Sequence, residues 1–384
     1  MTNNISQEYV VKMRRHFHEN PELSFKEFKT AETVENELRG MGLLPKRVAN
    51  TGVIVDISGK SKGKTVAFRA DIDALPVTEK NDVEYKSRNS GIMHACGHDC
   101  HTAMALDIAK YFAENRQFDG TVRVFFQPAE EAPPGGAVKM IQDGVLDNVD
   151  YVVGQHVSSE LAAGTIGYRK GPANANADSF HIKILGKGGH GSAPHKAIDA
   201  IYIAAEFITL AQTIVSRKTD PVKAAVITFG TINGGYRHNI IGDEVEMTGT
   251  VRTQDDETRS LVKNELGNIL DGLCKATHSE YKYEYEEGYP VMVNNPEICN
   301  VISDVAGKIV GTNNVIEMPQ RMGGEDFGYY LQKVKGAFYY LGVGNAEKGF
   351  TSPNHSPTFD ADEEALPVGT KVGVAVIKKL LSME

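Results

Sequence analysis

The order of predicted strands and helices changes in the middle of the chain, and this change limits the possible folds more than any other feature. Between residues 51 and 157, short runs rich in β-branched residues alternate with segments of helical spacing. Alternating strands and helices indicate a mainly parallel sheet covered by helices. Between residues 179 and 286 the order becomes strand, helix, strand, strand, helix, strand, which is the pattern of a ferredoxin-like unit.

The predicted elements divide the chain into three segments. Before the change we expect helices at 6–20, 101–115 and 137–144, a helix opened by a capping box of Ser24 and Glu27, and strands at 51–57, 65–72, 121–126 and 151–157. The middle segment predicts strands at 179–185, 224–230, 244–252 and 280–286 and helices at 197–216 and 258–278, and regular structure resumes at 296–310, 337–343 and 363–381. We therefore predict an α/β domain built from residues 1–174 and 291–384, interrupted by a ferredoxin-like lid domain at 175–290.

Composition narrows the class of protein. The 384 residues, 41% of them hydrophobic, fit two globular domains. A net charge of -9 and the lack of a basic stretch argue against a nucleic-acid partner, so we expect a small-molecule ligand. The sequence has no run of about 18 apolar residues and no export signal, so we expect no membrane contact and a cytoplasmic location. Four cysteines are too few to staple this chain, so a special cysteine should be a metal ligand or a nucleophile.

Three of the twelve histidines fall within residues 93–101, together with cysteines and just before a predicted helix. Cys96 and His98 are two residues apart with a glycine between them, so a thiolate and an imidazole can converge on one metal ion. The alternative interpretation is a polar loop that caps the helix. The density of potential ligands favours the metal site.

Further polar residues follow the ends of predicted strands. Glu130 and Glu131 come after the strand at 121–126, and His156 lies near the end of the strand at 151–157. Ligands of open α/β sheets gather beyond the carboxyl ends of strands, where all three would lie. Two adjacent carboxylates are costly there unless a cation is near. One could bind the metal while the other takes a proton from water, although such a pair is often only exposed surface.

Two other segments could reach the same edge of the sheet. His355 lies in a loop bounded by prolines and is a further ligand candidate. Asp71 and Asp73 end an early strand after Arg69, although aspartates at strand ends often only accept hydrogen bonds from backbone amides. We therefore expect Asp71 and Asp73 to hold the metal ligands in place and not to bind the metal themselves.

His190 lies in the predicted lid, in a glycine-flanked stretch between a strand and a helix. Its glycines allow close backbone approach or movement. A plain strand-to-helix connection would have the same composition, so the sequence around His190 alone leaves both interpretations open.

Six motifs resemble one family, the dinuclear metal-dependent amidohydrolases that include aminoacylases, carboxypeptidase G and dipeptidases. They extend through nearly the whole chain and are Arg-Ala-Asp-Ile-Asp-Ala-Leu-Pro at 69–76, His-Ala-Cys-Gly-His-Asp at 94–99, Gln-Pro-Ala-Glu-Glu at 127–131, Gly-His-Gly-Ser-Ala-Pro-His at 189–195, Gly-Gly-Glu-Asp-Phe at 323–327 and His-Ser-Pro at 355–357. The branch that the chain resembles most comprises N-acyl-amino-acid amidohydrolases such as hippurate hydrolase and indole-acetyl-amino-acid hydrolase.

The resemblance implies roles for particular residues. It implies that two divalent ions are bound by Cys96, His98, Glu131, His156 and His355. Glu130 would be the general acid/base, and His190 would stabilise the oxyanion from the partner subunit of a homodimer or a higher homo-oligomer. Asn239 would bind substrate, although this chain has Gly242 where relatives have a proline. Asp71 occupies the place of a histidine ligand in many relatives, and His98 takes over that ligand role.

The expected reaction is hydrolysis of the amide bond of N-acyl amino acids or short peptides with a free carboxylate. Thiolate, imidazole and carboxylate ligands together suit zinc, manganese, cobalt or nickel. A dipeptidase or carboxypeptidase of the same family is an alternative. Two alternatives belong to other classes of protein. One is a cysteine hydrolase with Cys96 as nucleophile, although the Cys-Gly-His spacing does not aim an imidazole at the thiol. The other is a two-lobed binding protein without turnover.

Overall fold

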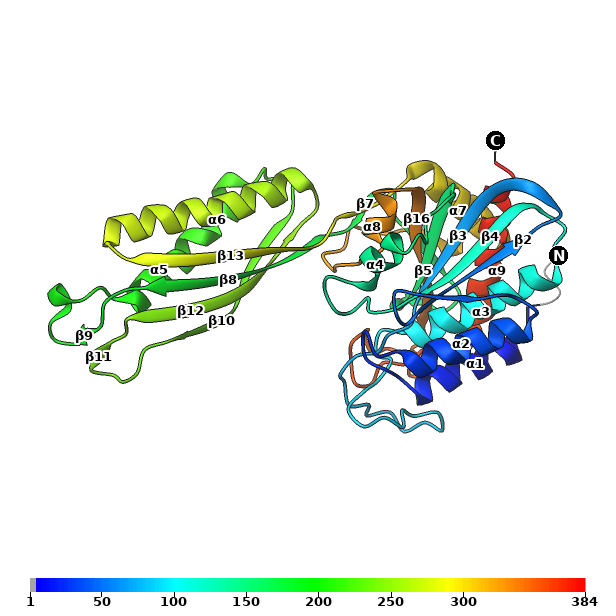
Figure 1. Cartoon of the computed structure of the whole chain (residues 1–384), viewed down its shortest axis with the longest axis horizontal. Helices are drawn as coiled ribbons and strands as arrows, with labels where there is room; N and C mark the ends of the chain where they lie inside the picture. Colours follow the sequence, from blue (N-terminus) through cyan, green and yellow to red (C-terminus); the bar gives the residue numbers. More distant parts are fainter. Residues whose placement is uncertain (1–4, 384) are drawn as a thin grey trace. The chain divides into compact units, whose positions relative to one another are not determined.

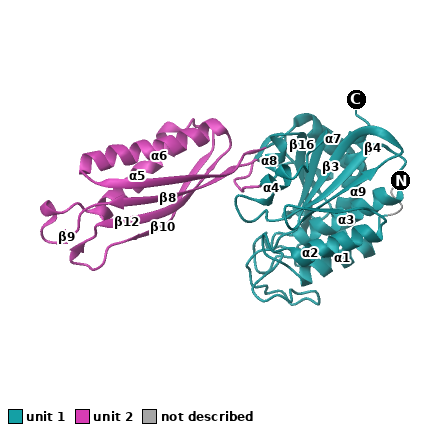
Figure 2. Ribbon diagram, in the orientation of Figure 1, with its two compact units in different colours: residues 1–173, 293–319, 326–384 teal, residues 174–292, 320–325 magenta. Residues whose placement is uncertain are grey.

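The computed structural model describes residues 5–383, and the chain divides into two compact units (Figure 2). Unit 1 contains the described residues up to Ala173, Val293–Pro319, and the residues from Asp326 onward. Unit 2 contains Asn174–Met292 and Gln320–Glu325. The expected cytoplasmic location rests partly on the N-terminal residues. Of these, residues 1–4 lie outside the described part.

Unit 1 is built on one eight-stranded sheet (Figure 1). Its strand order is β1 (Lys46–Val48), β2 (Gly52–Ser58), β4 (Asp119–Gln127), β3 (Ser61–Asp71), β5 (Tyr151–Ala162), β16 (Lys335–Gly344), β6 (Ile166–Tyr168) and β15 (Val315–Glu317). The four central strands β4, β3, β5 and β16 are parallel, so their carboxyl ends lie at one edge. The predicted mainly parallel sheet is confirmed.

Helices cover the sheet of unit 1. They are α1 (Gln7–Glu19), α2 (Phe28–Gly40), α3 (His98–Glu114), α4 (Gly136–Gln142), α7 (Pro296–Val310), α8 (Gly328–Leu331) and α9 (Leu366–Leu381), with 3-10 turns at Thr312–Asn314 and Glu363–Ala365. α3 and α9 contact β3, whereas α4 contacts β4 and α8 contacts β16. Successive residues of β3 from Val66 to Asp71 are all buried, as expected for a strand covered on both faces.

The predicted capping box of Ser24 and Glu27 is wrong. α2 begins at Phe28, and its N-cap residue Glu27 makes no side-chain capping bond. The Glu27 carboxylate instead accepts hydrogen bonds from the Thr51 hydroxyl and from backbone N–H groups, while the Ser24 hydroxyl donates to Asp73. Both side chains are therefore used in tertiary contacts, which a local capping pattern cannot reveal.

Unit 2 has the predicted order of two β-α-β halves. Its elements are β8 (Asn176–Leu185), α5 (Ala200–Thr213), β10 (Ala225–Gly234), β12 (Glu244–Thr253), α6 (Asp256–Thr277) and β13 (Glu280–Tyr289). The strands form an antiparallel sheet in the order β10-β12-β8-β13, and α5 and α6 pack on it around a core of their own (Figure 1). The ferredoxin-like order is confirmed.

Short elements complete the chain. β9 (Gly189–His190) pairs with β11 (Ile240–Ile241), β7 (Gly171–Asn174) pairs with β14 (Met292–Asn294), and single helical turns lie at Pro194–Lys196 and Ile214–Lys218. Among residues 5–383, every helix is too short or too polar to cross a bilayer.

Candidate metal centre

The carboxyl ends of the central strands bring the site residues together. Asp71, the last residue of β3, pairs in register with Gln127, the last residue of β4. His98 begins α3, three residues earlier than the sequence predicted, directly after Gly97 with a φ of 90°. A Cβ atom on Gly97 would lie 2.3 Å from a methyl carbon of Val157. Glycine therefore allows the segment that carries Cys96 to approach β5.

The structure places the five predicted metal ligands close together. Cys96 Sγ lies 3.5 Å from His156 Nε2, and Glu131 Oε1 lies 3.2 Å from His355 Nε2 and 3.9 Å from His98 Nε2. One ligand atom from each of Cys96, Glu131 and His355 lies within 4.8 Å of the other two. A thiol, a carboxylate and three imidazoles therefore face one another.

Hydrogen bonds hold the loop of His355 beside Cys96. The His355 backbone N–H donates to the carbonyl oxygen of Ala95 at 2.7 Å, and the Asn354 side chain donates to the carbonyl oxygen of Cys96 at 2.9 Å. The loop is thus tied to the backbone of the ligand segment itself. His355 reaches the site although it lies more than 250 positions after Cys96 along the chain.

The Nδ1 atoms of two candidate ligands point away from the site. His98 Nδ1 lies 2.9 Å from the carbonyl oxygen of Asp73, and His156 Nδ1 lies 2.7 Å from the carbonyl oxygen of Val157. A carbonyl oxygen accepts only, so each Nδ1 carries the hydrogen and each Nε2 is left for a metal. These bonds fix the tautomer and the ring orientation that metal binding needs.

His98 Nε2 shows what kind of group fits the site. It is buried and makes no hydrogen bond to any residue between 5 and 383, although carboxylate oxygens of Asp71 and Glu130 lie 3.6 Å and 3.9 Å away. Burial lowers the pKa of His98, but the carboxylates of Asp71 and Asp73 outweigh it and raise that pKa to about 10. The local excess of negative charge therefore favours a cation at Nε2.

The Cys96 thiol fits the same conclusion. Burial, followed by the nearby carboxylates of Glu131 and Glu130, raises the pKa of Cys96 well above its usual value. Without a cation the sulfur is therefore a neutral thiol, which is a poor nucleophile. A divalent cation reverses this preference, because it deprotonates a coordinating thiol. The residues present thus fit a metal centre better than a cysteine nucleophile.

Asp73 contacts both His98 and the acidic loop, which is the segment between β4 and α4 that carries Glu130 and Glu131. Its Oδ1 and Oδ2 accept hydrogen bonds from the backbone N–H groups of Glu130 and Glu131, each at 3.0 Å. Oδ1 also lies 3.2 Å from His98 Nδ1, and Oδ2 accepts a bond from the Ser24 hydroxyl at 2.7 Å. Asp73 therefore lies behind the candidate ligands and fixes their positions.

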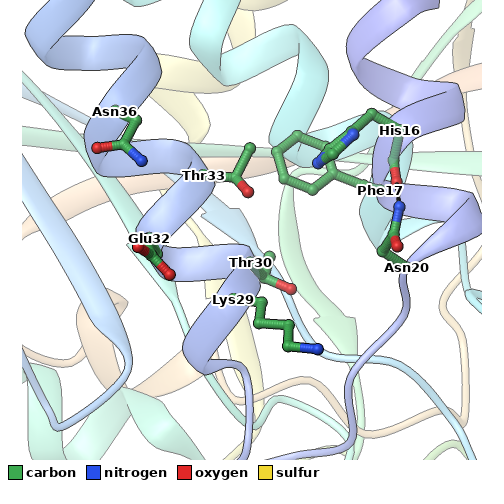
Figure 3. Close-up of a pocket in the computed structure, with 8 residues that line it drawn as sticks. All are labelled: His16, Phe17, Asn20, Lys29, Thr30, Glu32, Thr33 and Asn36. Atoms are coloured by element: carbon green, nitrogen blue, oxygen red, sulfur yellow. Dashed lines mark hydrogen bonds between the residues drawn. The ribbon is translucent and has the colours of Figure 1, made fainter.

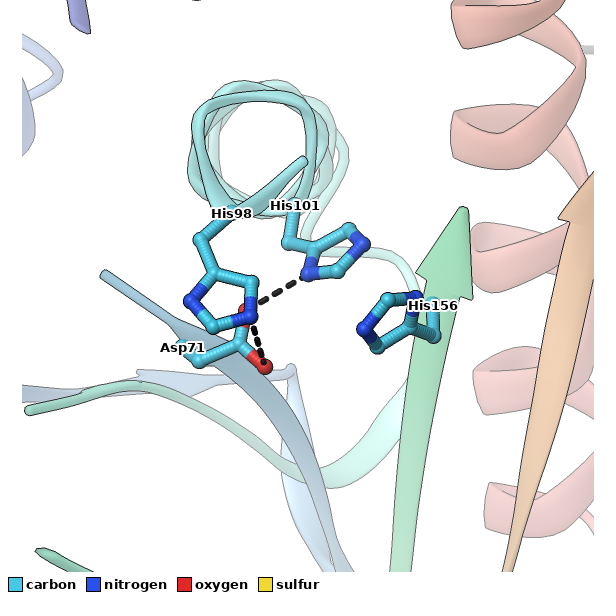
Figure 4. A group of neighbouring side chains, drawn as sticks. All are labelled: Asp71, His98, His101 and His156. Carbon is cyan, nitrogen blue, oxygen red and sulfur yellow. Dashed lines mark hydrogen bonds and ion pairs between the residues drawn. The ribbon is translucent and has the colours of Figure 1, made fainter. Parts of the chain in front are cut away.

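Asp71 and His101 form a second support, shown in Figure 4. His101 Nδ1 lies 2.5 Å from Asp71 Oδ1, and His101 Nε2 accepts the backbone N–H of Val157 at 2.8 Å. Asp71, His98, His101 and His156 could offer a metal four ligand atoms within 4.8 Å of one another. Both nitrogens of His101 are already used, however, so we assign His101 to the support of β5. No role for His101 was predicted from the sequence, although its place one helical turn after His98 puts both on one face.

Glu130 and Glu131 lie on the segment between β4 and α4. Glu130 is buried, with 7% of its surface exposed, and Ala129 before it has a φ of 52°. The Ala129 N–H donates to Glu27 at 2.9 Å. The acidic pair is therefore held in a defined conformation and is not a solvated surface pair.

The two predicted residues of unit 2 lie next to each other. His190 in β9 pairs with Ile240 in β11, and Asn239 directly precedes Ile240. The Gly191 N–H donates to the Asn239 carbonyl oxygen at 2.9 Å. Both side chains are exposed, and His190 Nδ1 accepts a bond from the Ser192 backbone. They form one surface of unit 2.

A cavity of about 330 Å³ lies elsewhere in unit 1, between α1 and α2 (Figure 3). It is lined by His16, Phe17, Asn20, Lys29, Thr30, Glu32, Thr33 and Asn36. None of the candidate ligands lines this cavity. The metal centre at the strand ends is therefore a separate site.

Comparison with known proteins assigns the family. Residues 67–379 match the model of peptidase family M20/M25/M40. The chain is 43% identical over 368 residues to thermostable carboxypeptidase 2 of Saccharolobus solfataricus, with 94% of this chain and 93% of that protein covered. It is 46% identical over 290 residues to an N-acyl-L-amino acid amidohydrolase of Geobacillus stearothermophilus, covering 75% and 78%. The chain therefore belongs to the M20/M25/M40 peptidase family.

A solved structure agrees with this assignment. It is a Bacillus subtilis protein described as a dinuclear metal binding peptidase of the M20 family. Its TM-score to this chain is 0.87 at 34% identity, with 98% of this chain and 99% of that one covered. The family and the fold inferred from the six motifs are confirmed.

We predict that Asp73→Asn weakens metal binding by about tenfold to a hundredfold, as is typical when a group supporting a ligand is lost. An amide can accept at one oxygen only, so the backbone N–H of either Glu130 or Glu131 loses its partner. Competition with a chromogenic chelator measures the change. Ser24→Ala is the control, because it removes one bond to Asp73 and leaves the carboxylate in place. Equal affinities for both variants would contradict the supporting role.

Proposed function

We propose that this chain hydrolyses the amide bond of N-acyl amino acids or short peptides with a free carboxylate, using two divalent ions held by Cys96, His98, Glu131, His156 and His355. The observation that carries the proposal is the convergence of these five side chains beside Glu130, whose carboxylate lies 3.9 Å from His98 Nε2. Five ligands are too many for one tetrahedral zinc ion. Zinc, manganese, cobalt and nickel all suit the mixed set.

Glu130 is the proposed general acid/base. Bound divalent ions would lower the pKa of a water molecule and polarise the scissile carbonyl. Glu130 would accept the proton of that water and later deliver it to the leaving amine. Its position supports this role, because its carboxylate lies 3.9 Å from His98 Nε2 and its backbone is fixed by Asp73.

The names of relatives support the substrate class. One relative is named an N-acyl-L-amino acid amidohydrolase, and another a thermostable carboxypeptidase. Both names describe cleavage of an amide bond next to a free carboxylate. A mixed pool of N-acyl amino acids and short peptides, analysed by mass spectrometry, tests the proposal. Loss of the N-acyl amino acids with release of free amino acids supports it. Cleavage of the peptides alone would narrow the substrate class to that of a carboxypeptidase or dipeptidase, and no product at all would favour a binding protein.

A cysteine hydrolase is the proposal's rival in another class. The raised pKa of Cys96 counts against it, and so does the surrounding set of histidines and glutamates, which such an enzyme would not need. Inactivation by a chelator, reversed by added metal, separates the two, because a thiol nucleophile needs no metal.

We predict different outcomes for the two neighbouring glutamates. Glu130→Gln should keep two ions per chain by elemental analysis and lower kcat by about a hundredfold to ten-thousandfold, because only proton transfer is lost. Glu131→Gln should bind less metal, because an amide is a weaker ligand than a carboxylate. Wild-type kcat in Glu130→Gln at saturating metal would contradict the acid/base assignment, and a single ion in the fully active wild type would contradict the dinuclear proposal.

We further propose that the chain forms a homodimer through unit 2. Strand β10 is an edge strand, and apolar side chains are exposed on it and on the adjacent helix α5. They are Val226 and Ile232 on β10 and Ile201, Tyr202 and Leu210 on α5. An exposed edge strand flanked by apolar residues is suited to pairing with a second copy. The dimer would bring His190 and Asn239 of one chain to the substrate of the other.

His190→Ala should lower kcat by about a hundredfold, or ~3 kcal/mol, without loss of metal, because its hydrogen bond would form as oxyanion charge develops. Mixing His190→Ala with Glu130→Gln subunits, under conditions shown to exchange subunits, should restore activity if His190 acts across the dimer. Each heterodimer would then contain one intact site. Activity that stays at the parental level would exclude action across the dimer.

Charge and cysteine content support proposals for the kind of substrate and for the location of the protein. The net charge of -9 supports a small-molecule substrate over a nucleic acid. All four cysteines are buried free thiols, which suits a reducing compartment, and we propose a cytoplasmic location.

A further inference from the structure

The segment from Gln127 to Ala137 carries the proposed acid/base, and buried carboxylates hold its backbone. Glu27 accepts the N–H of Ala129, and Asp73 accepts those of Glu130 and Glu131. These bonds explain how the middle of the segment is fixed. A further buried carboxylate contacts the two ends of the segment.

Asp326 joins those two ends. Its carboxylate accepts hydrogen bonds from Gln127 Nε2 at 2.7 Å and 2.9 Å and from the Ala137 backbone N–H at 3.1 Å. Gln127 is the last residue of β4, and Ala137 lies in the first turn of α4. Asp326 is fully buried and also accepts a bond from Arg69 Nη2 at 2.9 Å. One carboxylate therefore closes the acidic segment into a loop.

The packing around Asp326 leaves little freedom. A Cβ atom on Gly135 would lie 2.5 Å from Asp326 Oδ2, and one on Gly136 would lie 1.9 Å from the carbonyl oxygen of Pro128. Two successive glycines thus let the backbone approach the carboxylate and itself. A displacement of Asp326 would have to move this closely packed loop.

We propose that Asp326 is a positioning residue for Glu130, acting by clamping both ends of the loop that carries it. The inference rests on the proposed role of Glu130. Asp326 is the Asp of the motif Gly-Gly-Glu-Asp-Phe, which the sequence analysis singled out without giving it a role. It is also the residue at which the chain returns to unit 1 after the segment Gln320–Glu325 of unit 2.

The first test is Asp326→Asn. The amide keeps the shape of the side chain but turns one acceptor into a donor. Because every partner of Asp326 named above is also a donor, at least one of these hydrogen bonds is lost. We expect kcat at saturating metal to fall by about tenfold to a hundredfold, the scale of a small misplacement of a reacting group. KM should stay within about threefold, because substrate contacts are not removed.

Asp178→Asn is the matched control. Asp178 is a buried carboxylate of unit 2 that accepts bonds from Arg259 and from the Gly288 N–H, so its loss is chemically similar. It should lower thermal stability and leave kcat unchanged well below the melting temperature. An equally small change of kcat in Asp326→Asn and Asp178→Asn would overturn the proposal.

A charge swap keeps the test valid if the single variant folds poorly. In Gln127→Glu/Asp326→Asn, the new amide can donate to the new carboxylate, and Arg69 and Tyr330 can still donate to residue 127 as they do now. The swap should recover most of the kcat lost in Asp326→Asn. A swap that folds, binds metal and recovers none of the lost kcat would overturn the clamp.

A second double variant tests whether Asp326 acts through Glu130. In a Glu130→Gln background, Asp326→Asn should cause no further loss of kcat, because residues that act as a unit are not additive. Losses that multiply would overturn the proposal. Wild-type kcat in Glu130→Gln alone would instead overturn the proposed function, so the two failures are distinguishable.

Discussion

The buried carboxylate of Asp73 is the interaction on which the site depends. It connects the acidic loop after β4 with His98 at the start of α3. A buried carboxylate is costly unless its oxygens are satisfied, so loop and helix must keep their positions together. Burial raises the pKa of Asp73, but hydrogen bonding to His98 and its charge outweigh this and lower that pKa. Because Asp73 stays ionised, it can accept from both backbone amides and still orient the imidazole.

A second group of buried ion pairs fixes the segment that follows His355. Arg14 of α1 is fully buried and forms ion pairs with Asp99, next to His98, and with Asp360, in the segment that follows His355. Removing one partner of such a group typically costs about 3–5 kcal/mol, because a buried charge is left unpaired. Segments distant in sequence are therefore held in place by buried charges.

Much of this organisation can be predicted from the sequence, and the failures have physical causes. The parallel sheet and the inserted β-α-β-β-α-β unit could be predicted, because strands and helices leave different spacings of apolar residues in the sequence. The start of α3 was misplaced, since His98 looks like part of a polar loop but is fully buried. The return of 320–325 to unit 2 has no periodic signal. The roles of Glu27, His101 and Asp326 depend on contacts between distant segments, which no local pattern contains.

We propose that Cys96 binds metal as a thiolate within a mixed set of ligands. X-ray absorption spectroscopy of the zinc-loaded protein tests it most directly, because sulfur scatters differently from nitrogen and oxygen. We predict a zinc–sulfur shell at about 2.3 Å in the wild-type protein that disappears in Cys96→Ser. A wild-type spectrum with nitrogen and oxygen neighbours alone, at full metal occupancy, would contradict the account.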